Sequence, residues 1–195
     1  SRNMRKTFVI ISISDRVKEL NDLVDSIMLF PKFDSYDINL LFQDNKDNKH
    51  EIKHRHRYKS IIVKDELLGC HGARVILLRN LIDYDIYINL DDDMLLTKYT
   101  DYSKSIQKAT EKDTGFVLTN WAKTENLMLK KVPKMKDTFV KQVLVYQGGG
   151  MVYSEKIAQV MRRLKPIKST FDTEWSLTSY LLGYNNYRYL GSLAI

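Results

Sequence analysis

The feature that most constrains the fold of this chain is a short apolar stretch that ends in three consecutive carboxylates. Residues 86–90 are rich in β-branched and aromatic side chains, a composition typical of a strand buried on both faces. The chain then continues directly into Asp91, Asp92 and Asp93. Adjacent carboxylates repel one another by roughly 1 to 4 kcal/mol per pair at contact distance, depending on the dielectric. The sequence therefore indicates either a bound cation or a solvated acidic turn.

The spacing of the three aspartates predicts that they point to two different faces of the strand. Side chains two residues apart on a strand share a face, so Asp91 and Asp93 can address one ligand while Asp92 points elsewhere. Ligands that offer only oxygen suit Mg²⁺ or Mn²⁺, which keep coordination positions for phosphate oxygens. If a cation binds, we expect Mn²⁺ or Mg²⁺.

The rest of the chain alternates strand and helix patterns, which predicts an α/β fold with a mostly parallel central sheet. Apolar periodicity places a helix between two early strands, after a cap at Ser14 or Asp15. Residues 123–141 are rich in lysine and have no clear pattern. The expected strands are residues 7–13, 38–42, 61–63, 86–90, 116–119, 143–146 and 187–190, and the expected helices are residues 17–28, 71–82, 99–109, 154–163 and 174–182.

Composition limits the class of protein. The chain has 195 residues, of which 44% are hydrophobic, enough for one domain with a real core. Its aliphatic runs are too short for a transmembrane segment. Cys70 is the single cysteine and there is no signal-peptide pattern, so we expect a cytoplasmic protein, or one in the host cytoplasm if it is viral. The net charge of +7 favours a polyanionic partner: a nucleotide, a nucleic acid or an anionic membrane surface.

A basic segment over residues 50–59 has two interpretations. It is either a solvated excursion or a contact surface for an anionic acceptor. His54 and His56 within it are a weak metal signal, because no carboxylate or cysteine companion is near in the sequence.

Taken together, the order and spacing of these segments resemble the family 2-like glycosyltransferases of the GT-A fold, which transfer sugars from nucleotide donors. The resemblance covers most of the chain. In that family a polar turn with an arginine follows the first strand, an aspartate ends the second, a small residue and an arginine open the helix before the acidic motif, and a D-x-D follows. The matching residues here are Ser12 to Arg16, Asp44, Ala73-Arg74, and Asp91 with Asp93.

The resemblance continues into the second half. A glycine-rich turn on the acceptor side matches residues 148–151, and an acidic segment that opens a helix matches Phe171-Asp172-Thr173-Glu174-Trp175. Three departures stand out. Asp44 lacks the usual acidic pair, Phe171 replaces an acid, and no histidine follows position 71 to serve a metal. Compact enzymes of this kind occur in large DNA viruses.

The resemblance implies one GT-A domain over residues 1–195, with a donor-binding half at about 7–96 and an acceptor-side half at about 97–195. The short tail after the last strand leads us to expect either a domain cut from a longer chain or an unusually small enzyme. The implied activity is transfer of a hexose from a UDP-sugar, UDP-glucose favoured, to a hydroxyl of a glycan or glycoprotein, with inversion.

The resemblance also assigns roles to residues. Asp93 would hold the metal with Asp91, and Asp172 would be the catalytic base with Glu174 in reserve. The donor-binding residues would be Ser12, Ser14, Arg16, Asp44, His71, Arg74, Asp91 and Asp92, and the acceptor-side residues would be Gly148, Gly149, Gly150 and Trp175.

Each assignment has a structural alternative. Arg16 and Arg74 fit ordinary surface or helix positions, Asp44 fits a turn, and Asp172 fits a helix cap. His71 also fits the start of a helix, and Trp121 and Trp175 also fit the core.

Rival functions explain less of the sequence. A basic nucleic-acid-binding module accounts for the charge but not for three aspartates at the end of a buried strand, and a DNA-modifying glycosyltransferase would combine both features. A sugar-nucleotidyltransferase would need a glycine-rich loop after the first strand, and residues 12–16 contain no glycine. A haloacid-dehalogenase-type phosphatase would place its acidic motif after the first strand.

Overall fold

The amino-terminal β-α-β unit forms as its sequence pattern predicts. In the computed structural model, β1 (Lys6–Ile13) and β2 (Asp37–Gln43) are parallel neighbours, with α1 (Val17–Met28) connecting them. A single 3-10 turn over Ser14–Arg16 separates β1 from α1. The structure describes residues 2–122, 134–144, 150–168 and 172–195, with the side chains of Trp121 and Asp172 excepted.

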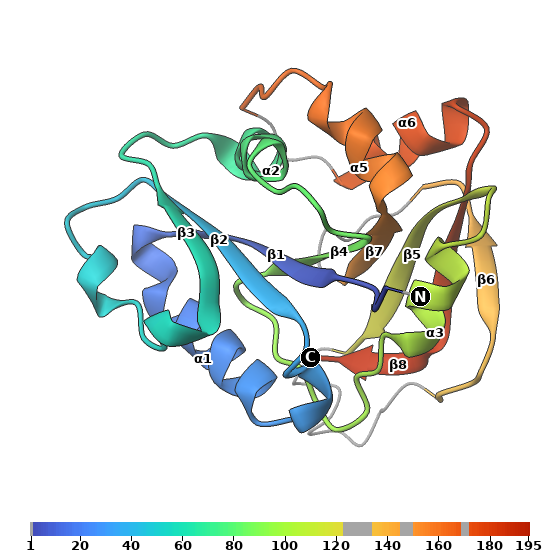
Figure 1. Cartoon of the computed structure of the whole chain (residues 1–195), viewed down its shortest axis with the longest axis horizontal. Coiled ribbons are helices and arrows are strands. Elements are labelled where there is room, and N and C mark those ends of the chain that lie inside the picture. The colour runs from blue at the N-terminus through green and yellow to red at the C-terminus, as the bar shows by residue number, and fades with distance from the viewer. Residues whose placement is uncertain (1, 123–133, 145–149, 169–171) are drawn as a thin grey trace.

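Eight described strands form one mixed sheet (Figure 1). Four of them, β3, β2, β1 and β4, run parallel to one another. β7 is antiparallel to both β4 and β5, β5 is parallel to β8, and β6 closes the far edge antiparallel to β8. The order across the sheet is β3 (Tyr58–Val63), β2, β1, β4 (Ile86–Asp91), β7 (Met151–Ser154), β5 (Thr114–Trp121), β8 (Asn185–Ala194) and β6 (Phe139–Gln142).

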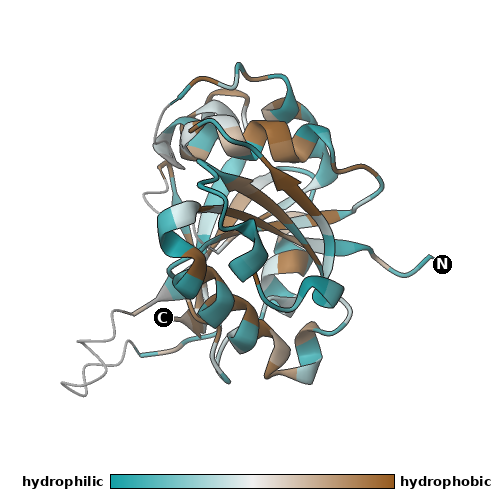
Figure 2. Ribbon diagram, turned by 90° about the vertical axis from the view of Figure 1, so that its left-hand side faces the viewer, coloured by the Kyte–Doolittle hydropathy of each residue, from teal (hydrophilic) through white to brown (hydrophobic). Residues whose placement is uncertain are grey.

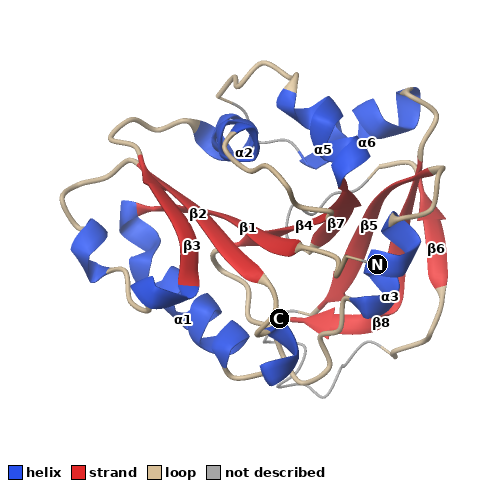
Figure 3. Ribbon diagram, viewed as in Figure 1, coloured by secondary structure: helices blue, strands red, loops and turns tan. Residues whose placement is uncertain are grey.

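Helices cover both faces of the sheet (Figure 3). Alternate residues of β1 face opposite sides, so Phe8 packs in a cluster with α1 and α3 (Ser103–Ala109), and Val9 packs in a cluster with α2 (Gly69–Arg79), α5 (Glu155–Arg162) and α6 (Asp172–Leu181). Hydrophobic residues accordingly concentrate in the strands of the interior (Figure 2). Burial on both faces explains the nearly continuous apolar runs of the central strands.

The main differences from the sequence prediction lie around β6 and β7. A strand was expected over residues 143–146, but Val143 and Leu144 lie outside any strand, and residues 145 and 146 lie outside the described ranges. The observed strand is β6, which lies just before these residues in the sequence. Because β6 is at the exposed edge of the sheet, it has no apolar run from which a strand could be predicted. The short β7 was not predicted, because its four residues directly precede a helix.

Other elements match the prediction apart from their ends. α3 begins at Ser103 and not near Tyr99, and α2 ends at Arg79. Further 3-10 turns occur at Pro31–Phe33, Lys49–Glu51 and Arg55–Arg57. Within the described ranges, no helix combines the length and apolar character that a bilayer crossing requires.

Candidate active site

The candidate site lies where the carboxyl ends of β1, β2 and β4 meet. β1 pairs with β2 on one side and with β4 on the other, and Ile11 is level with Asp91. β2 lies on one side of β1 and β4 on the other, so the order of the strands changes direction at β1. In α/β proteins, ligands commonly bind at the carboxyl ends of the strands at such a switch point. The residues that follow these strands are Ser14, Asp44 and the three aspartates.

Asp92 is the buried member of the acidic run. Its carboxylate accepts a hydrogen bond of 2.8 Å from the Ser12 hydroxyl, and Arg16 Nε lies 2.9 Å from its other oxygen. Burial raises the pKa of Asp92 to about 6, although Ser12 and Arg16 act to lower it. Protein groups therefore enclose the Asp92 carboxylate, and its contribution to donor binding stays a prediction.

The side chains of Asp91 and Asp93 are more exposed than that of Asp92. Their side chains are 41% and 59% exposed, against 10% for Asp92. Arg74, buried on α2, places Nη2 2.5 Å from Asp91, and Arg16 places Nη2 3.1 Å from Asp93. The two arginines offset the mutual repulsion of the carboxylates, and the structure separates Asp92 from the exposed pair.

The chemistry of this pair fits a hard cation. Among the described residues, no three His, Cys, Asp or Glu side chains gather to hold a metal by themselves. Asp91 and Asp93 offer only carboxylate oxygens, and Mg²⁺ is usually held by one or two carboxylates together with waters and substrate phosphates. The residues present fit Mg²⁺ or Mn²⁺ bound jointly with a phosphate ligand.

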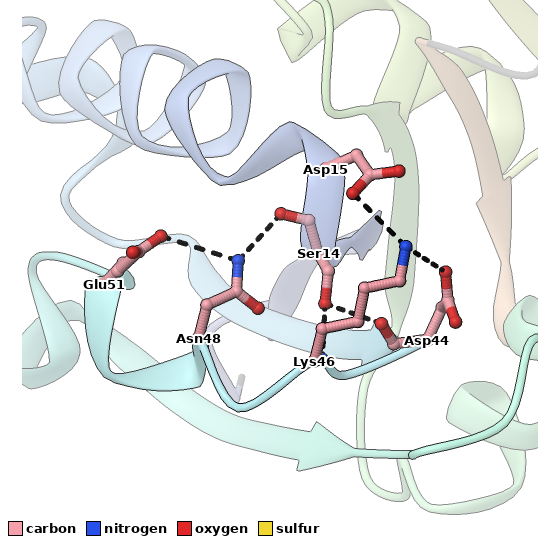
Figure 4. Close-up of polar contacts among 6 residues, drawn as sticks. All are labelled: Ser14, Asp15, Asp44, Lys46, Asn48 and Glu51. Atoms are coloured by element: carbon pink, nitrogen blue, oxygen red, sulfur yellow. Dashed lines mark hydrogen bonds and ion pairs between the residues drawn. The ribbon is translucent and has the colours of Figure 1, made fainter.

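Ser14 organises the loop that follows β2 (Figure 4). Its hydroxyl donates to the Asp44 carbonyl (2.6 Å) and accepts from the Lys46 backbone N–H (2.8 Å), and Asn48 Nδ2 donates to the Ser14 carbonyl (2.9 Å). Asp44 has φ of 50°, a left-handed conformation that aspartate tolerates better than most residues. Ser14 therefore shapes the loop that presents the Asp44 side chain.

Lys46 is a cation beside Asp44 that no motif of the sequence marks. Its Nζ lies 3.5 Å from Asp15 Oδ1 and 3.6 Å from Asp44 Oδ2, and all three side chains are at least one-third exposed. The sequence feature that could have identified Lys46 as a site residue is its position two residues after Asp44. The loop thus offers a solvent-facing lysine with two carboxylates next to the strand ends.

His71 and Trp175 form a buried pair that connects three elements. The Trp175 indole N–H donates to His71 Nδ1 (2.9 Å), so the imidazole carries its proton on Nε2, which donates to the Lys165 carbonyl (2.7 Å). Both residues are at most 3% exposed. Trp175 is therefore a core residue in this structure, since its side chain is almost fully buried in the cluster on the α2 side of the sheet. Its predicted acceptor-side role stays a prediction.

The hydrogen bond between His71 and Trp175 also connects the helix that carries Asp172, the expected base, to the helix that contacts the acidic run. Asp172 is the first residue of α6, which carries Trp175, and His71 lies on α2 one turn before Arg74, the partner of Asp91. Glu174 is exposed on α6. The connection places the start of α6 on the α2 side of the sheet.

Gly150 is held between two strands. Its N–H donates to the Asn89 carbonyl (2.6 Å), its carbonyl accepts from the Thr119 N–H (2.9 Å), and its φ is +77°. A Cβ at this position would lie 3.0 Å from Thr119 Cβ, so glycine is needed both for the backbone conformation and for the close approach. Gly148, Gly149 and Phe171 lie outside the described residues.

Two side chains of the basic segment, residues 50–59, make polar contacts on the α1 side of the structure. His54 Nε2 lies 2.5 Å from Asp25 Oδ1, and Arg57 donates to the Phe33 carbonyl (2.9 Å). His54 and His56 have ring centroids 6.2 Å apart, but among the described residues no group of three His, Cys, Asp or Glu side chains is placed to hold a metal ion there. The pair does not form a metal centre of its own.

Comparison with known proteins depends on the fold. No protein-family model matches the sequence, and no curated protein sequence matches it significantly. Solved structures match over nearly the whole chain. TarS residues 1–349 from S. aureus has a TM-score of 0.70 at 16% identity, covering 97% of this chain and 59% of that one. GalNAc-T7, solved with UDP, GalNAc and Mn²⁺, has a TM-score of 0.71 at 14% identity, covering 100% and 44%.

A third match is the mannosyltransferase PcManGT from Pyrobaculum calidifontis, in complex with GDP-Man and Mn²⁺. Its TM-score is 0.73 at 12% identity, covering 98% of this chain and 56% of that one. This chain has the GT-A fold. At these identities the likeness establishes the GT-A fold alone. The chain spans less than two thirds of the length of each of these three proteins.

Proposed function

We propose that this GT-A chain is a metal-dependent glycosyltransferase that moves a hexose from a UDP-sugar, UDP-glucose favoured, to a hydroxyl of a glycan on a protein, with inversion. The observation that carries the proposal is the division of the acidic run. Asp92 is enclosed by Ser12 and Arg16, whereas the side chains of Asp91 and Asp93 are more exposed. Similar folds occur in structures that contain UDP or GDP-Man with Mn²⁺.

The donor would lie along the carboxyl ends of β1, β2 and β4. Asp44, at the end of β2, would meet the nucleobase, and Asp91 would meet the ribose or the metal. Arg16, 39% exposed, would face the diphosphate, since guanidinium groups suit phosphate oxygens. Asp93 would hold Mn²⁺ or Mg²⁺, and the cation, when bound, would offset the charge on the leaving diphosphate.

Asp172 would serve the acceptor. Its carboxylate would take the proton of the acceptor hydroxyl while that oxygen forms a bond to the anomeric carbon. The bond between the anomeric carbon and the diphosphate oxygen would break, and UDP would leave with the electron pair of that bond. This single displacement inverts the configuration, with Glu174 as the reserve candidate for the base.

Calorimetry of UDP binding tests the donor and metal assignments. We expect UDP to bind at least about tenfold more weakly in EDTA than in Mn²⁺, because the diphosphate would otherwise face uncompensated carboxylates. Asp93→Asn should remove this Mn²⁺ dependence, whereas Asp22→Asn, an exposed aspartate on α1, should keep it. GDP in place of UDP tests the base preference.

Equal UDP affinity in Mn²⁺ and EDTA would contradict the metal assignment. Absence of any nucleotide binding, with salt-sensitive binding to DNA that a chelator does not change, would favour the nucleic-acid-binding alternative. A product that retains the donor's anomeric configuration, read by NMR, would contradict the single displacement.

A further inference from the structure

Arg188 on β8 is a half-buried cation that has no carboxylate partner among the residues the structure describes. The buried Arg74, by comparison, is paired with Asp91. Within the described ranges, the side chain of Arg188 makes one hydrogen bond, from Nη1 to Asn120 Oδ1, and that contact is long at 3.4 Å. Burial lowers the pKa of Arg188 below its ordinary value. A guanidinium has five N–H donors, so most of those of Arg188 are left to water or to a ligand.

The side chain of Arg188 lies on the face of the sheet that α6 covers. Asn186, two residues earlier on β8, accepts a hydrogen bond at Oδ1 from the Ser179 hydroxyl (3.0 Å) and donates from Nδ2 to the Ser176 carbonyl (2.9 Å). Side chains two residues apart on a strand share a face, and β6 pairs with this stretch of β8 without a break in register. Arg188 is therefore on the α6 face, closer than Asn186 to the carboxyl end of β8.

The register of the sheet relates Arg188 to the acidic run. A row of paired residues crosses the sheet from Asn89 of β4 through Met151 of β7 and Leu118 of β5 to Arg188. β7 is antiparallel to both β4 and β5, and β5 is parallel to β8, so β4 and β8 run in the same direction. Asp91 lies two residues beyond Asn89 on β4. Its side chain and that of Arg188 are therefore on the same face, toward the same edge of the sheet.

The position of Arg188 favours the acceptor over the donor diphosphate as its partner. β4 and β8 are three strand spacings apart, about 14 Å in all. A diphosphate bound with a cation at the acidic run would be close to Arg16 and Arg74, which contact the carboxylates of that run. Arg188 lies instead on the part of the sheet covered by α6, the helix that begins with the proposed base, Asp172.

The chemistry of Arg188 and Asn120 selects an anionic group. A guanidinium binds a phosphate or a carboxylate through parallel N–H donors. Asn120 Oδ1 faces Arg188, so its Nδ2 can donate to the same ligand. Partial burial strengthens such a contact, because less water screens it. The net charge of +7 also favours an anionic partner.

We infer that Arg188, together with Asn120, binds an anionic group, a phosphate or a carboxylate, that the acceptor carries. The inference rests on the proposed function and names the class of its acceptor: a glycan with a negative charge near the hydroxyl that receives the sugar. Arg188 positions this acceptor and takes no part in the proton transfer, which stays with Asp172.

NMR of arginine side chains tests the inference at the residue itself. The Nε–Hε resonance of Arg188 is assigned by its loss in Arg188→Gln. The chain, saturated with UDP and Mg²⁺, is titrated with glucose 6-phosphate as the anionic probe and with methyl glucoside as its neutral counterpart. We expect glucose 6-phosphate to shift the Arg188 resonance and to bind about fivefold to tenfold more tightly than methyl glucoside, the effect of one charge-assisted contact.

Substitutions separate Arg188 from general effects of charge. Arg188→Gln should remove the preference for the phosphate probe, whereas Arg188→Lys, which keeps the charge but not the parallel donors, should keep part of it. Arg163→Gln, an exposed arginine at the end of α5, is the matched control and should keep all of it. Arg188→Gln should also keep the thermal midpoint of the unchanged chain, since no ion pair with a described residue is lost.

Equal binding of the two probes, or a preference that persists in Arg188→Gln, would overturn the inference and leave the proposed function intact. An equally large shift of the Arg188 resonance with UDP and Mg²⁺ alone would also overturn it, because the donor diphosphate would then be the partner. UDP-glucuronic acid tests the transferred sugar as the source of the negative charge. Tighter binding of this donor than of UDP-glucose, lost in Arg188→Gln, would assign Arg188 to the donor. Failure of UDP to bind would contradict the proposed function, and the phosphate probe without UDP would still report on Arg188.

Discussion

At the scale of single residues, three adjacent aspartates have three different environments. Asp92 is buried against Ser12, Asp91 is paired with the buried Arg74, and Asp93 shares Arg16 and faces solvent. The same functional group can thus support the fold at one position and remain available to a ligand at the next. Substitutions at neighbouring aspartates should therefore have different effects, so stability and ligand binding need to be measured separately.

Asp92→Ala should mainly affect stability. It removes the acceptor of the Ser12 hydroxyl, which is 1% exposed, and a buried donor without a partner costs about 1 to 3 kcal/mol. Urea unfolding measures the loss. Asp93→Ala should leave unfolding nearly unchanged, since that side chain is 59% exposed, but abolish sugar transfer. If Asp92→Ala reduced Mn²⁺-dependent UDP binding more than Asp93→Ala, the assignment of the metal to Asp93 would be wrong.

Arg16→Gln should strengthen the binding of Mn²⁺ in the absence of nucleotide. Arg16 Nη2 lies 3.1 Å from Asp93, so its charge competes with a cation for that carboxylate. Removing it should raise the Mn²⁺ affinity by about threefold to tenfold, the effect of one nearby charge in a partly exposed site. Titration followed by Mn²⁺ electron paramagnetic resonance reads this directly. Lys18→Gln removes one positive charge a short distance along the chain and should leave the affinity unchanged; an equal rise in both variants would indicate only net charge.

At the scale of elements, hydrogen bonds between distant segments fix where helices begin. Asp101 accepts from the Ser103 N–H (2.8 Å) just before α3, and its own N–H donates to Ser192 on β8 (2.9 Å). His71 similarly joins α2 to α6 and to the segment after α5. Such contacts set the position of a helix relative to the sheet, which amphipathic pattern alone does not do.

Asp101 should make the stability of the chain depend on pH in the acid range. Partial burial acts to raise the pKa of Asp101, but hydrogen bonds from Ser103 and the charges of Lys32 and Lys104 lower it below its ordinary value of 3.8. A lowered folded-state pKa contributes stability above the unfolded-state pKa, and the contribution is lost as pH falls through the folded-state pKa.

The comparison of the unchanged chain with Asp101→Asn measures this contribution. Because the group is exposed to solvent screening, the difference in unfolding free energy should be about 0.3 to 1 kcal/mol at pH 7. It should shrink as the pH is lowered below about 4. Urea unfolding at several pH values provides the test, and a difference that stays constant down to pH 2.5 would show that the charge of Asp101 does not matter.

At the scale of the whole molecule, the expected donor and acceptor functions come from different parts of the sheet. The acidic run follows β4 on the parallel side, whereas Asp172 opens α6, which packs on β5 and β8. The two parts meet through β7, which pairs with β4 and with β5. We therefore expect donor binding and transfer to be separable by mutation.

Asp172→Asn should separate them. Asparagine keeps the size of the side chain but does not accept a proton near neutral pH, so transfer should slow by about 10² to 10⁴-fold, the usual contribution of a general base. The Kd for UDP with Mn²⁺ should stay within about twofold, since Asp172 is assigned to the acceptor. Thr173→Ala, next along α6, is the matched control. Unchanged transfer in Asp172→Asn would shift the role of base to Glu174.

The sequence by itself determined the β1, α1, β2 and β4 elements and the position of the acidic run, because burial and amphipathic periodicity are local patterns. Only the tertiary structure decided that Asp92 is the enclosed carboxylate, through Ser12 located 80 residues away, and that Trp175 bonds His71 across 104 residues. It also decided the antiparallel insertion of β7 and the contact of Arg188 with Asn120 across 68 residues. These features depend on which distant groups meet, and no window of neighbouring residues contains that information.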